Sequence, residues 1–303
     1  MMFHIDVYSL YFAFFCKMFF PRIKTYVKLD ASIVSITSEQ KLEYPNFKNP
    51  RTIKEYIKTW QYNSIDLLTV ETTSAFDALK AKPFFQNRNI HLIPNGLDDG
   101  YNKKINFAHK QKTIITVGRL GSYQKNTELL LEVIAQLHLY DWKIKLIGEL
   151  ETKEQNFQSY LDTFFAHYPA LKAAVTLTGS ISDSEALQKE YEAASIFVFP
   201  SRHESFGIAT LEAASAGCYI VATNVGAAYD ITKQGTLGFI CDTSSAGKQN
   251  EDSIKQQMIE HLQKIIDGTI SIADKRQEQS QYVQDHFLMQ TIISKQCFKQ
   301  WIK

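Results

Sequence analysis

The sequence predicts an α/β protein with parallel, doubly wound sheets, and three observations support this. After Lys112, short apolar segments alternate with helical segments, which is typical of strand–helix–strand units that form a parallel sheet. Three expected strands end in glycine, at Gly118, Gly148 and Gly179, and a glycine there lets a ligand approach the backbone. A length of 303 residues, 45% hydrophobic and 21% charged, indicates about two globular domains.

The second half of the chain carries the more regular pattern. We expect strands at Thr113–Val117, Lys143–Ile147, Val175–Thr178, Ile196–Phe199, Tyr219–Ala222 and Phe239–Cys241. We expect helices at Asn126–Leu139, Glu154–Ala166, Asp183–Ala194 and Gly207–Ala216. Asn126 is a plausible N-cap and Gly217 a helix stop.

The first half has a thinner pattern and is short for a complete Rossmann-like domain. Strands are expected at Tyr26–Leu29, Leu67–Val70 and Ile90–Ile93, and helices at Ile53–Trp60 and Ser74–Leu79. Pro94-Asn-Gly96 is a turn signal at the expected start of the linker. We therefore predict a shortened first domain at residues 1–108 and a second at 109–288. The last helix, at 289–303 and clearest over Met289–Trp301, is a candidate to pack back on the first domain.

The apolar segment from Val7 to Phe20 is too short to span a bilayer. It also lacks a basic start and a small-residue cleavage site, so a signal peptide is not expected. We expect a core helix of the first domain. Peripheral membrane contact through its phenylalanines is the open alternative. The phenylalanines concerned are Phe12, Phe14, Phe15 and Phe19.

Charge and cysteine content argue against other classes of protein. A net charge of +1 leaves no electrostatic footprint for nucleic acid. The four cysteines are scattered and show no metal-ligand spacing with histidine, so neither disulfides nor a metal centre are expected. No strand is followed by a G-x-G-x-x-G motif with an acidic residue further on, so a nicotinamide-dependent oxidoreductase is a poor interpretation.

The segment from Glu204 to Glu212 is the most informative one. It follows a buried strand that ends at Pro200, and it contains a turn at Gly207 and the start of a helix. Such a turn presents free backbone N–H groups and the positive end of a helix, where α/β proteins bind phosphates. The two carboxylates suit the hydroxyls of a sugar and a ribose. Glu212 alone is open to a second interpretation, as an exposed helical residue.

A second glycine-bearing loop, Val117-Gly-Arg-Leu-Gly-Ser-Tyr-Gln-Lys-Asn126, carries two cations. Arg119 can bind a diphosphate through two parallel hydrogen bonds from its guanidinium, and Lys125 adds a point charge. Together with a helix N-terminus, they would stabilise a departing nucleoside diphosphate. The alternative is a solvated basic pair on a surface loop. His203, beside Glu204, is expected to be a surface residue.

Taken together, these segments resemble the retaining glycosyltransferases of family 4, which have the GT-B architecture of two facing Rossmann-like domains. The resemblance is strongest over residues 94–212. It rests on five landmarks in the expected order: Pro94-Asn-Gly-Leu-Asp98, Val117-Gly-Arg-Leu120 with Lys125, Leu146-Ile-Gly148, Leu177-Thr-Gly179, and Phe199-Pro-Ser201 leading into Glu204–Glu212.

The resemblance implies a role for each matching position. Arg119, Lys125 and Glu204 would be catalytic, the first two on the donor diphosphate and Glu204 on the donor sugar. Glu212 would accept the ribose hydroxyls. The remaining donor-binding positions would be Gly118 on the glycine loop, Gly179, Ser180 and Ile181 near the base, and Ser205, Phe206 and Gly207 against the sugar and phosphates. The family implies no metal and no cofactor besides the nucleotide-sugar co-substrate.

Two departures from the family pattern concern the first domain. The usual first strand with its glycine-rich loop has no counterpart, so either the start is missing or the protein is a reduced variant. Where many members place a histidine, Tyr26-Val-Lys-Leu-Asp30 offers Lys28 and Asp30. Asp30 is an acceptor-side candidate, and the alternative is a polar residue at a strand end.

The expected function is transfer of a sugar from a nucleoside-diphosphate donor to an acceptor hydroxyl, with retention of configuration. Family analogy suggests polysaccharide or glycolipid biosynthesis with a glycan or lipid-linked acceptor. It also suggests a cytoplasmic location, with the inner face of the plasma membrane as an open alternative. The rival hypothesis is a non-catalytic nucleotide-sugar binding protein or inactive fragment. The donor base, the sugar and the acceptor are left open.

Overall fold

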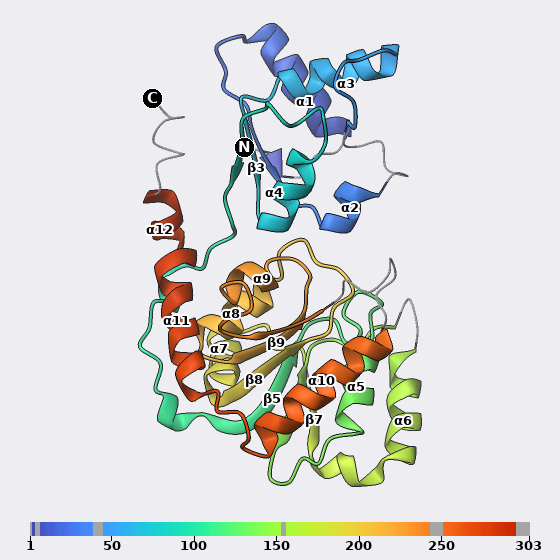
Figure 1. Ribbon diagram of the computed structural model, residues 1–303, viewed down its shortest axis with the longest axis vertical. Coiled ribbons are helices and arrows are strands. Elements are labelled where there is room, and N and C mark those ends of the chain that lie inside the picture. The colour runs from blue at the N-terminus through green and yellow to red at the C-terminus, as the bar shows by residue number, and fades with distance from the viewer. Residues whose placement is uncertain (1, 4–6, 39–44, 153–155, 243–250, 295–303) are drawn as a thin grey trace. The chain divides into compact units, whose positions relative to one another are not determined.

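The computed structural model describes residues 2–3, 7–38, 45–152, 156–242 and 251–294. The chain divides into two compact units, each with a parallel sheet (Figure 1). Unit 1 comprises Met1–Gly96, Glu204–Phe206 and Met289–Lys303, and unit 2 comprises Leu97–His203 and Gly207–Leu288. The first boundary between the units therefore follows Gly96, whereas the predicted one follows residue 108.

Unit 1 is built on a four-stranded sheet with the order β1-β2-β3-β4, in which every neighbouring pair is parallel. Its strands are β1 (Met2–Phe3), β2 (Tyr26–Leu29), β3 (Leu67–Val70) and β4 (Ile90–Leu92). Its helices are α1 (Val7–Phe19), α2 (Ile33–Thr37), α3 (Ile53–Asn63), α4 (Thr73–Lys80) and α12 (Met289–Ser294). Buried Val27, Leu29 and Val70 of the sheet pack with Ile36 and Leu79 of the helices.

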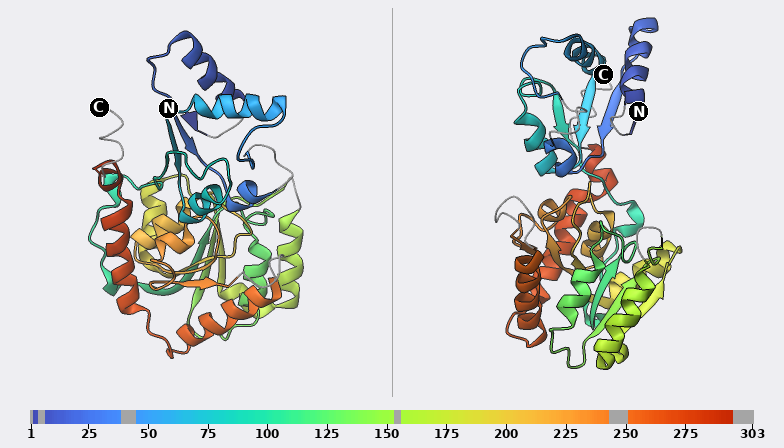
Figure 2. Two further views of the ribbon diagram at one scale, coloured as in Figure 1. Left: turned by 45° about the horizontal axis from the view of Figure 1, so that its top comes forward. Right: turned by 90° about the vertical axis from the view of Figure 1, so that its right-hand side faces the viewer.

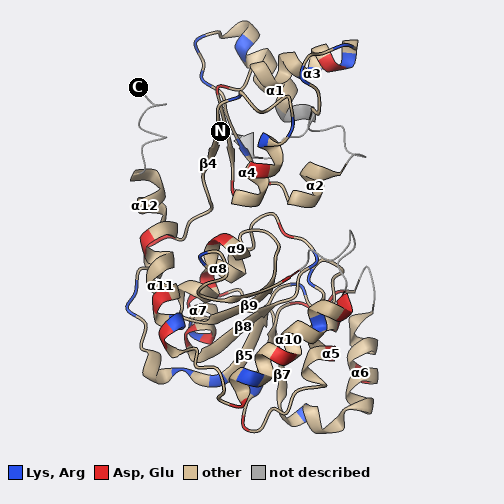
Figure 3. Cartoon of the chain, in the orientation of Figure 1, with Lys and Arg blue, Asp and Glu red and all other residues tan. Residues whose placement is uncertain are grey.

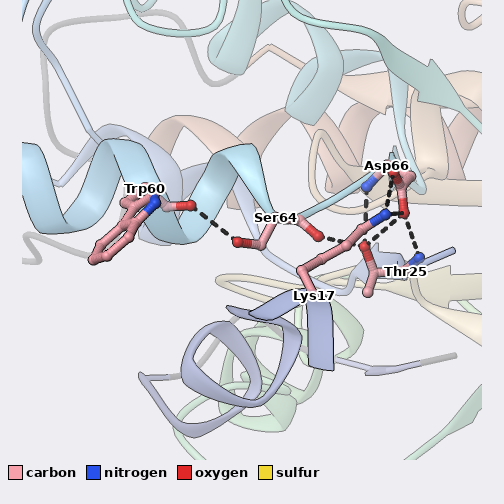
Figure 4. A network of polar contacts seen from close by, with 5 residues as sticks. All are labelled: Lys17, Thr25, Trp60, Ser64 and Asp66. Atoms are coloured by element: carbon pink, nitrogen blue, oxygen red, sulfur yellow. Dashed lines mark hydrogen bonds and ion pairs between the residues drawn. The ribbon is translucent and has the colours of Figure 1, made fainter. Parts of the chain in front are cut away.

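A polar network joins the amino ends of β2 and β3 to two helices (Figure 4). Asp66 accepts hydrogen bonds from the Lys17 ammonium at 2.8 Å, the Thr25 backbone N–H at 2.6 Å and the Thr25 hydroxyl at 3.0 Å. Ser64, which follows α3, donates its hydroxyl to the Trp60 carbonyl at 3.1 Å. One carboxylate therefore holds α1 and the starts of two neighbouring strands together.

Helix α1 is only partly a core helix, which corrects the sequence expectation. Leu10 and Ala13 are buried, but Phe12, Phe15 and Phe19 are 61%, 48% and 68% exposed. The reason is the distribution of its side chains: apolar residues occupy the whole circumference of α1, and only one stripe of a helix can face the sheet.

Unit 2 contains a six-stranded sheet with the order β10-β9-β8-β5-β6-β7, again parallel throughout. The strands are β5 (Gln111–Val117), β6 (Lys143–Ile147), β7 (Val175–Gly179), β8 (Ala194–Phe199), β9 (Tyr219–Thr223) and β10 (Phe239–Cys241). The chain starts at β5, moves outward to β7, and then returns to place β8 on the other side of β5. Ligands of such sheets bind beyond the carboxyl ends of the strands at this reversal.

Helices cover the sheet of unit 2 (Figures 1 and 2). They are α5 (Thr127–Ile134), α6 (Phe157–His167), α7 (Ser184–Ala193), α8 (Ile208–Ser215), α9 (Ala228–Ile231), α10 (Glu251–Ile266) and α11 (Ala273–Phe287). The core around β5, β6 and β8 includes Ile114, Ile144 and Ile196. Leu131 of α5 and Met258 of α10 are buried in the same core.

Several predicted ends need correction. Helix α5 stops at Ile134 and not at Leu139. Asn126 precedes α5, but its backbone is left-handed with φ 52° and its side chain makes no cap hydrogen bond. The predicted start of α6 at Glu154 and the end of the last helix at Trp301 lie outside the described residues. Helices α10 and α11 were not predicted at all.

Candidate active site

The reversal point of the unit 2 sheet lies between β5 and β8. The loop after β5 begins with Gly118 and Arg119, and the segment after β8 leads through Ser201 to the helix α8. Because the carboxyl ends of parallel strands meet at one edge of a sheet, both segments lie at the edge where α/β proteins bind ligands. This is where the sequence analysis placed the two most informative loops.

Three strand-end glycines line this edge and contact one another through their backbones. Gly118 donates its N–H to the Ile147 carbonyl at 3.0 Å, and Gly148 donates to the Gly179 carbonyl at 2.9 Å. A Cβ on Gly148 would lie 1.7 Å from the Gly118 carbonyl oxygen, and one on Gly118 would lie 3.1 Å from Cε of Lys125. The loop after β5 thus packs so closely that position 148 accepts only glycine.

Arg202, which the sequence analysis did not single out, holds the loop after β5 to the segment after β8. Its backbone N–H donates to the Gln124 carbonyl at 2.8 Å, and its guanidinium donates to the Tyr123 carbonyl at 2.7 Å. The guanidinium also pairs with the Glu251 carboxylate at 2.6 Å and lies 4.4 Å from the centroid of the Tyr123 ring. Half-buried His203 lies beside the same ring, at 6.5 Å between centroids.

The two predicted cations have different surroundings. Arg119 is 57% exposed on its side chain, and its Nε lies 3.5 Å from a carboxylate oxygen of buried Glu151. The Lys125 ammonium lies 5.0 Å from the centroid of the Phe199 ring, an attractive contact between a cation and an aromatic face. Glu151 therefore pairs with the arginine while more than half of the Arg119 side chain stays exposed.

The segment between β8 and α8 contains the first of the two glutamates. Glu204 and Phe206 are buried, at 7% and 2% exposure, and Glu204–Phe206 belong to unit 1 in the division of the chain. Gly207 then starts α8 with a left-handed φ of 87°, a conformation that favours glycine. In the first turn of α8 the Thr210 N–H donates to the Gly207 carbonyl at 3.0 Å, and the N–H groups before it have no acceptor within the helix.

Glu212, the second glutamate, is half-buried and held by two tyrosines. Tyr101 donates its hydroxyl to one carboxylate oxygen at 3.1 Å, and Tyr191 donates to the other at 3.2 Å. Burial raises the pKa of Glu212, although both hydrogen bonds act in the opposite direction. Tyr101 also lines a cavity of about 260 Å³ with Ser184, Glu185 and other residues. Neither tyrosine was predicted, because each lies far from Glu212 in the sequence.

The remaining predicted residues lie at two different sheets. Gly179 and Ser180 are exposed and Ile181 is half-buried at the end of β7, an edge strand of unit 2. Asp30 follows β2 in unit 1. Within the described ranges, no group of three or more His, Cys, Asp or Glu side chains is arranged to hold a metal ion. The described helices also include none long and apolar enough to cross a membrane.

A family profile described as "Glycosyl transferases group 1" matches residues 99–269. Among curated proteins, an uncharacterized glycosyltransferase of Methanocaldococcus jannaschii is 28% identical over 204 residues, which cover 61% of this chain and 48% of that protein. Mannosylfructose-phosphate synthase of Agrobacterium fabrum is 26% identical over 197 residues, or 60% of this chain and 42% of the relative. The chain thus spans about half the length of these relatives.

Solved structures of glycosyltransferases share the fold. Alr3699/HepE of Anabaena, solved in complex with UDP and glucose, matches with a TM-score of 0.70 and 17% identity over 99% of this chain and 77% of that one. The pneumococcal O-GlcNAc transferase GtfA, solved with UDP and GlcNAc, matches with a TM-score of 0.67 and 20% identity over 92% of this chain and 52% of that one.

Proposed function

Since the chain belongs to the family of glycosyl transferases group 1 and has the fold of GT-B enzymes, we propose that it moves a sugar from a nucleoside-diphosphate donor to an acceptor hydroxyl. The reaction would retain the configuration at the anomeric carbon. The observation that carries the proposal is the pair of loops at the β5/β8 reversal point, where Arg202 joins the cation-bearing loop to the segment that leads into α8.

This edge of the sheet supplies the positive charges and N–H donors that bind a diphosphate. Arg119 offers guanidinium N–H groups to solvent, Lys125 adds a second positive charge, and α8 contributes the N–H groups of its first turn. Preorganised charge of this kind stabilises the negative charge that develops on a departing phosphate. We assign diphosphate binding to Arg119 and Lys125, and close approach of the donor to Gly118.

The remaining residues are assigned to the ribose, the base and the sugar of the donor. Glu212 keeps a second lone pair on each oxygen beside its tyrosine bonds, so it can accept two ribose hydroxyls. Gly179, Ser180 and Ile181, at the end of β7, are assigned to the base. Glu204 is assigned to the donor sugar, with Ser205, Phe206 and Gly207 lying against the sugar and phosphates.

In the chemical step, the departing phosphate of the donor acts as the base for the acceptor hydroxyl. The bond from the anomeric carbon to the phosphate oxygen breaks, and a bond to the acceptor oxygen forms on the same face. The acceptor proton passes to the departing phosphate oxygen. The protein cations take the role that a metal ion has in other transferases, so we propose a metal-independent reaction without a further cofactor.

The class of acceptor is inferred from the roles that the names of similar proteins state. Similar proteins include a capsular polysaccharide biosynthesis glycosyltransferase of Staphylococcus aureus, 31% identical over 52% of this chain. We propose a glycan or lipid-linked acceptor, a role in polysaccharide or glycolipid biosynthesis, and a cytoplasmic site of action. The exposed phenylalanines of α1 support peripheral contact with the inner membrane face.

Calorimetry with UDP, GDP and ADP tests the donor site. We expect one nucleotide to bind the full chain and to bind Arg119→Ala and Glu212→Ala about 30-fold more weakly, a loss of about 2 kcal/mol in each case. Lys172→Ala, which removes an exposed lysine of the same unit, is the control and should bind like the unmodified protein. If no nucleotide binds, or if Arg119→Ala binds normally, the donor-site assignment is wrong.

A further inference from the structure

Unit 1 contains a cluster of charged and polar residues at the carboxyl edge of its own sheet. Lys28 lies on β2 and is 9% exposed, and Glu71, directly after β3, is 5% exposed. Asn95 follows β4, and Asp30 follows β2. Because β2, β3 and β4 are neighbours in a parallel sheet, these residues gather at the edge where α/β folds hold their ligands.

Direct contacts connect the members of this cluster. The Lys28 ammonium lies 3.2 Å from one carboxylate oxygen of Glu71, Oε1. The same ammonium donates a hydrogen bond to the side-chain oxygen of Asn95. The paired register of Lys28 with Thr69 and of Leu29 with Val70 places Asp30 and Glu71 at the ends of adjacent strands. The three residues Lys28, Glu71 and Asn95 therefore form one group.

The other carboxylate oxygen of Glu71, Oε2, is the unusual feature. It is buried and has no hydrogen-bond partner within the part of the chain that the structure describes. Burial raises the pKa of Glu71, and the nearby charge of Asp30 raises it further, against the lowering effects of Lys28 and of a hydrogen bond with the Asn95 side chain. Burying a charged group is unfavourable unless its hydrogen bonds are satisfied, so a ligand that donates a hydrogen bond to Oε2 would be stabilised there.

The chemistry of the cluster restricts what Oε2 can bind. The Lys28 ammonium is paired with Glu71, and the charge of Asp30 also acts on Glu71, so an anionic ligand such as a phosphate is disfavoured. A carboxylate oxygen accepts hydrogen bonds and needs a donor. A neutral ligand with hydroxyl groups satisfies Oε2 without adding charge, and the side chain of Asn95 offers further hydrogen bonds beside it.

We propose that Lys28, Glu71 and Asn95 form a hydroxyl-binding site in unit 1, and that Glu71 Oε2 accepts a hydrogen bond from a hydroxyl of the acceptor sugar. This inference rests on the proposed transferase function, in which a neutral sugar is the acceptor. It makes Glu71 a residue that touches the acceptor, and it makes Lys28 and Asn95 positioning residues that hold the carboxylate in place.

The test measures binding of three probes, the octyl β-glycosides of glucose, galactose and N-acetylglucosamine, by saturation-transfer NMR titration. We expect at least one to bind the full chain and to bind Glu71→Gln at least tenfold more weakly, because the amide puts a donor or a weaker acceptor where Oε2 stands. The affinity for the nucleotide that binds the unmodified protein, measured by calorimetry, should stay unchanged in Glu71→Gln.

Asp66→Asn provides a matched control, since Asp66 lies at the opposite end of the same strand and is also paired with a lysine. It should lower the melting temperature but leave glycoside affinity unchanged. If Glu71→Gln does not fold, the double variant Lys28→Met/Glu71→Gln removes both charges and should fold without glycoside binding.

Two results would overturn the proposal: equal glycoside affinity of Glu71→Gln and the unmodified protein, or no binding of any of the three glycosides. Failure of the proposed function is measured separately. It would appear as the absence of nucleotide binding to the unmodified protein, independently of the glycoside titrations.

Discussion

Glu212 is subject to two opposing effects, because burial disfavours its charge while two tyrosine hydroxyls stabilise it. Burial is the larger effect, and it raises the pKa of the carboxyl group. Below that pKa the carboxyl group loses part of its capacity to accept hydrogen bonds. If Glu212 binds the ribose hydroxyls, its protonation state therefore controls donor affinity.

The affinity for a nucleotide-sugar with the base that calorimetry identifies is expected to fall as the pH is lowered through the pKa of Glu212. The fall should begin at a higher pH than an ordinary glutamate, with a pKa of about 4.3, would produce. The nucleotide-sugar is the suitable ligand because it lacks the terminal phosphate of the free nucleoside diphosphate, which titrates near pH 6. Calorimetry from pH 5 to 8 measures the effect, with Glu212→Gln as the comparison. Equal pH profiles of the two proteins would contradict the assignment.

Gly148 makes the most restrictive contact at the site. Its Cβ position lies 1.7 Å from the Gly118 carbonyl oxygen, so Gly148→Ala forces the backbone of one loop to move. We expect a loss of stability of about 3 kcal/mol, in the range typical of severe core overpacking. Thermal unfolding measures it. Gly100→Ala, where a Cβ meets nothing within 4 Å, should be near neutral, and a similar small effect at Gly148 would show that the loop is pliable.

At the scale of elements, most strands were predictable, whereas β1 (Met2–Phe3) and several helices were not. Strands β2, β3, β6 and β10 match their predicted residues, because runs of apolar and β-branched residues mark buried parallel strands. Helix α11 buries Gln279 and Ser280 beside Val283 and Phe287, so its inner face carries no continuous apolar stripe. Helix α10 has a clear periodic signal at Ile254, Met258 and Leu262, which the sequence analysis overlooked.

The candidate site shows the same limit of prediction. Its motifs lie in short continuous segments and could be located from the sequence. The partners that hold them could not, because no local pattern marks them: Tyr101 and Glu212 are 111 residues apart, and Lys28 and Asn95 are 67 apart. Such pairs are decided by the tertiary fold, which brings distant segments of the chain together.

The network around Asp66 makes a prediction about the stability of unit 1. Although burial acts to raise it, the pKa of Asp66 is lowered by hydrogen bonds from Lys17 and Thr25. The folded state therefore favours the ionised form, and its contribution to stability is present above the unfolded pKa of about 3.9 and is lost as the pH falls through the folded pKa.

Asp66→Asn should cost about 1 kcal/mol at pH 7, a modest value because the Lys17–Asp66 pair is partly exposed. The difference from the unmodified protein should shrink toward pH 3, which lies below the unfolded pKa of about 3.9. Urea unfolding at both pH values measures it. A difference that stays constant with pH would mean that the carboxylate charge contributes nothing.

At the scale of the whole molecule, net charge and exposed apolar surface make different contributions to the affinity for a membrane. With a net charge of +1, global electrostatics provides little attraction to an anionic membrane. Figure 3 shows charged residues of both signs on the helices of unit 2, whereas α1 carries Lys17 alone. Any membrane affinity should therefore depend on the exposed aromatic side chains of α1.

Co-sedimentation with vesicles tests this dependence. The double variant Phe12→Ala/Phe19→Ala should reduce the fraction of protein bound to phosphatidylglycerol vesicles at least threefold, since it removes two largely exposed aromatic rings. Tyr140→Ala, which removes a 77% exposed tyrosine in unit 2, should bind like the unmodified protein. Equal binding of all three proteins would rule out α1 as the membrane-contacting element.

Arg202 makes hydrogen bonds to Gln124 and Tyr123, here called the Arg202 bridge. This bridge determines at which stage the loop after β5 loses its conformational entropy. Fixing the backbone of one loop residue costs about 1–2 kcal/mol, and the bridge makes the loop after β5 lose this freedom when the protein folds. A donor that arrives later finds the loop already ordered, so less of its binding energy is consumed by ordering. Without the bridge, each donor molecule would have to order the loop anew, and affinity would fall although no atom that touches the donor had changed.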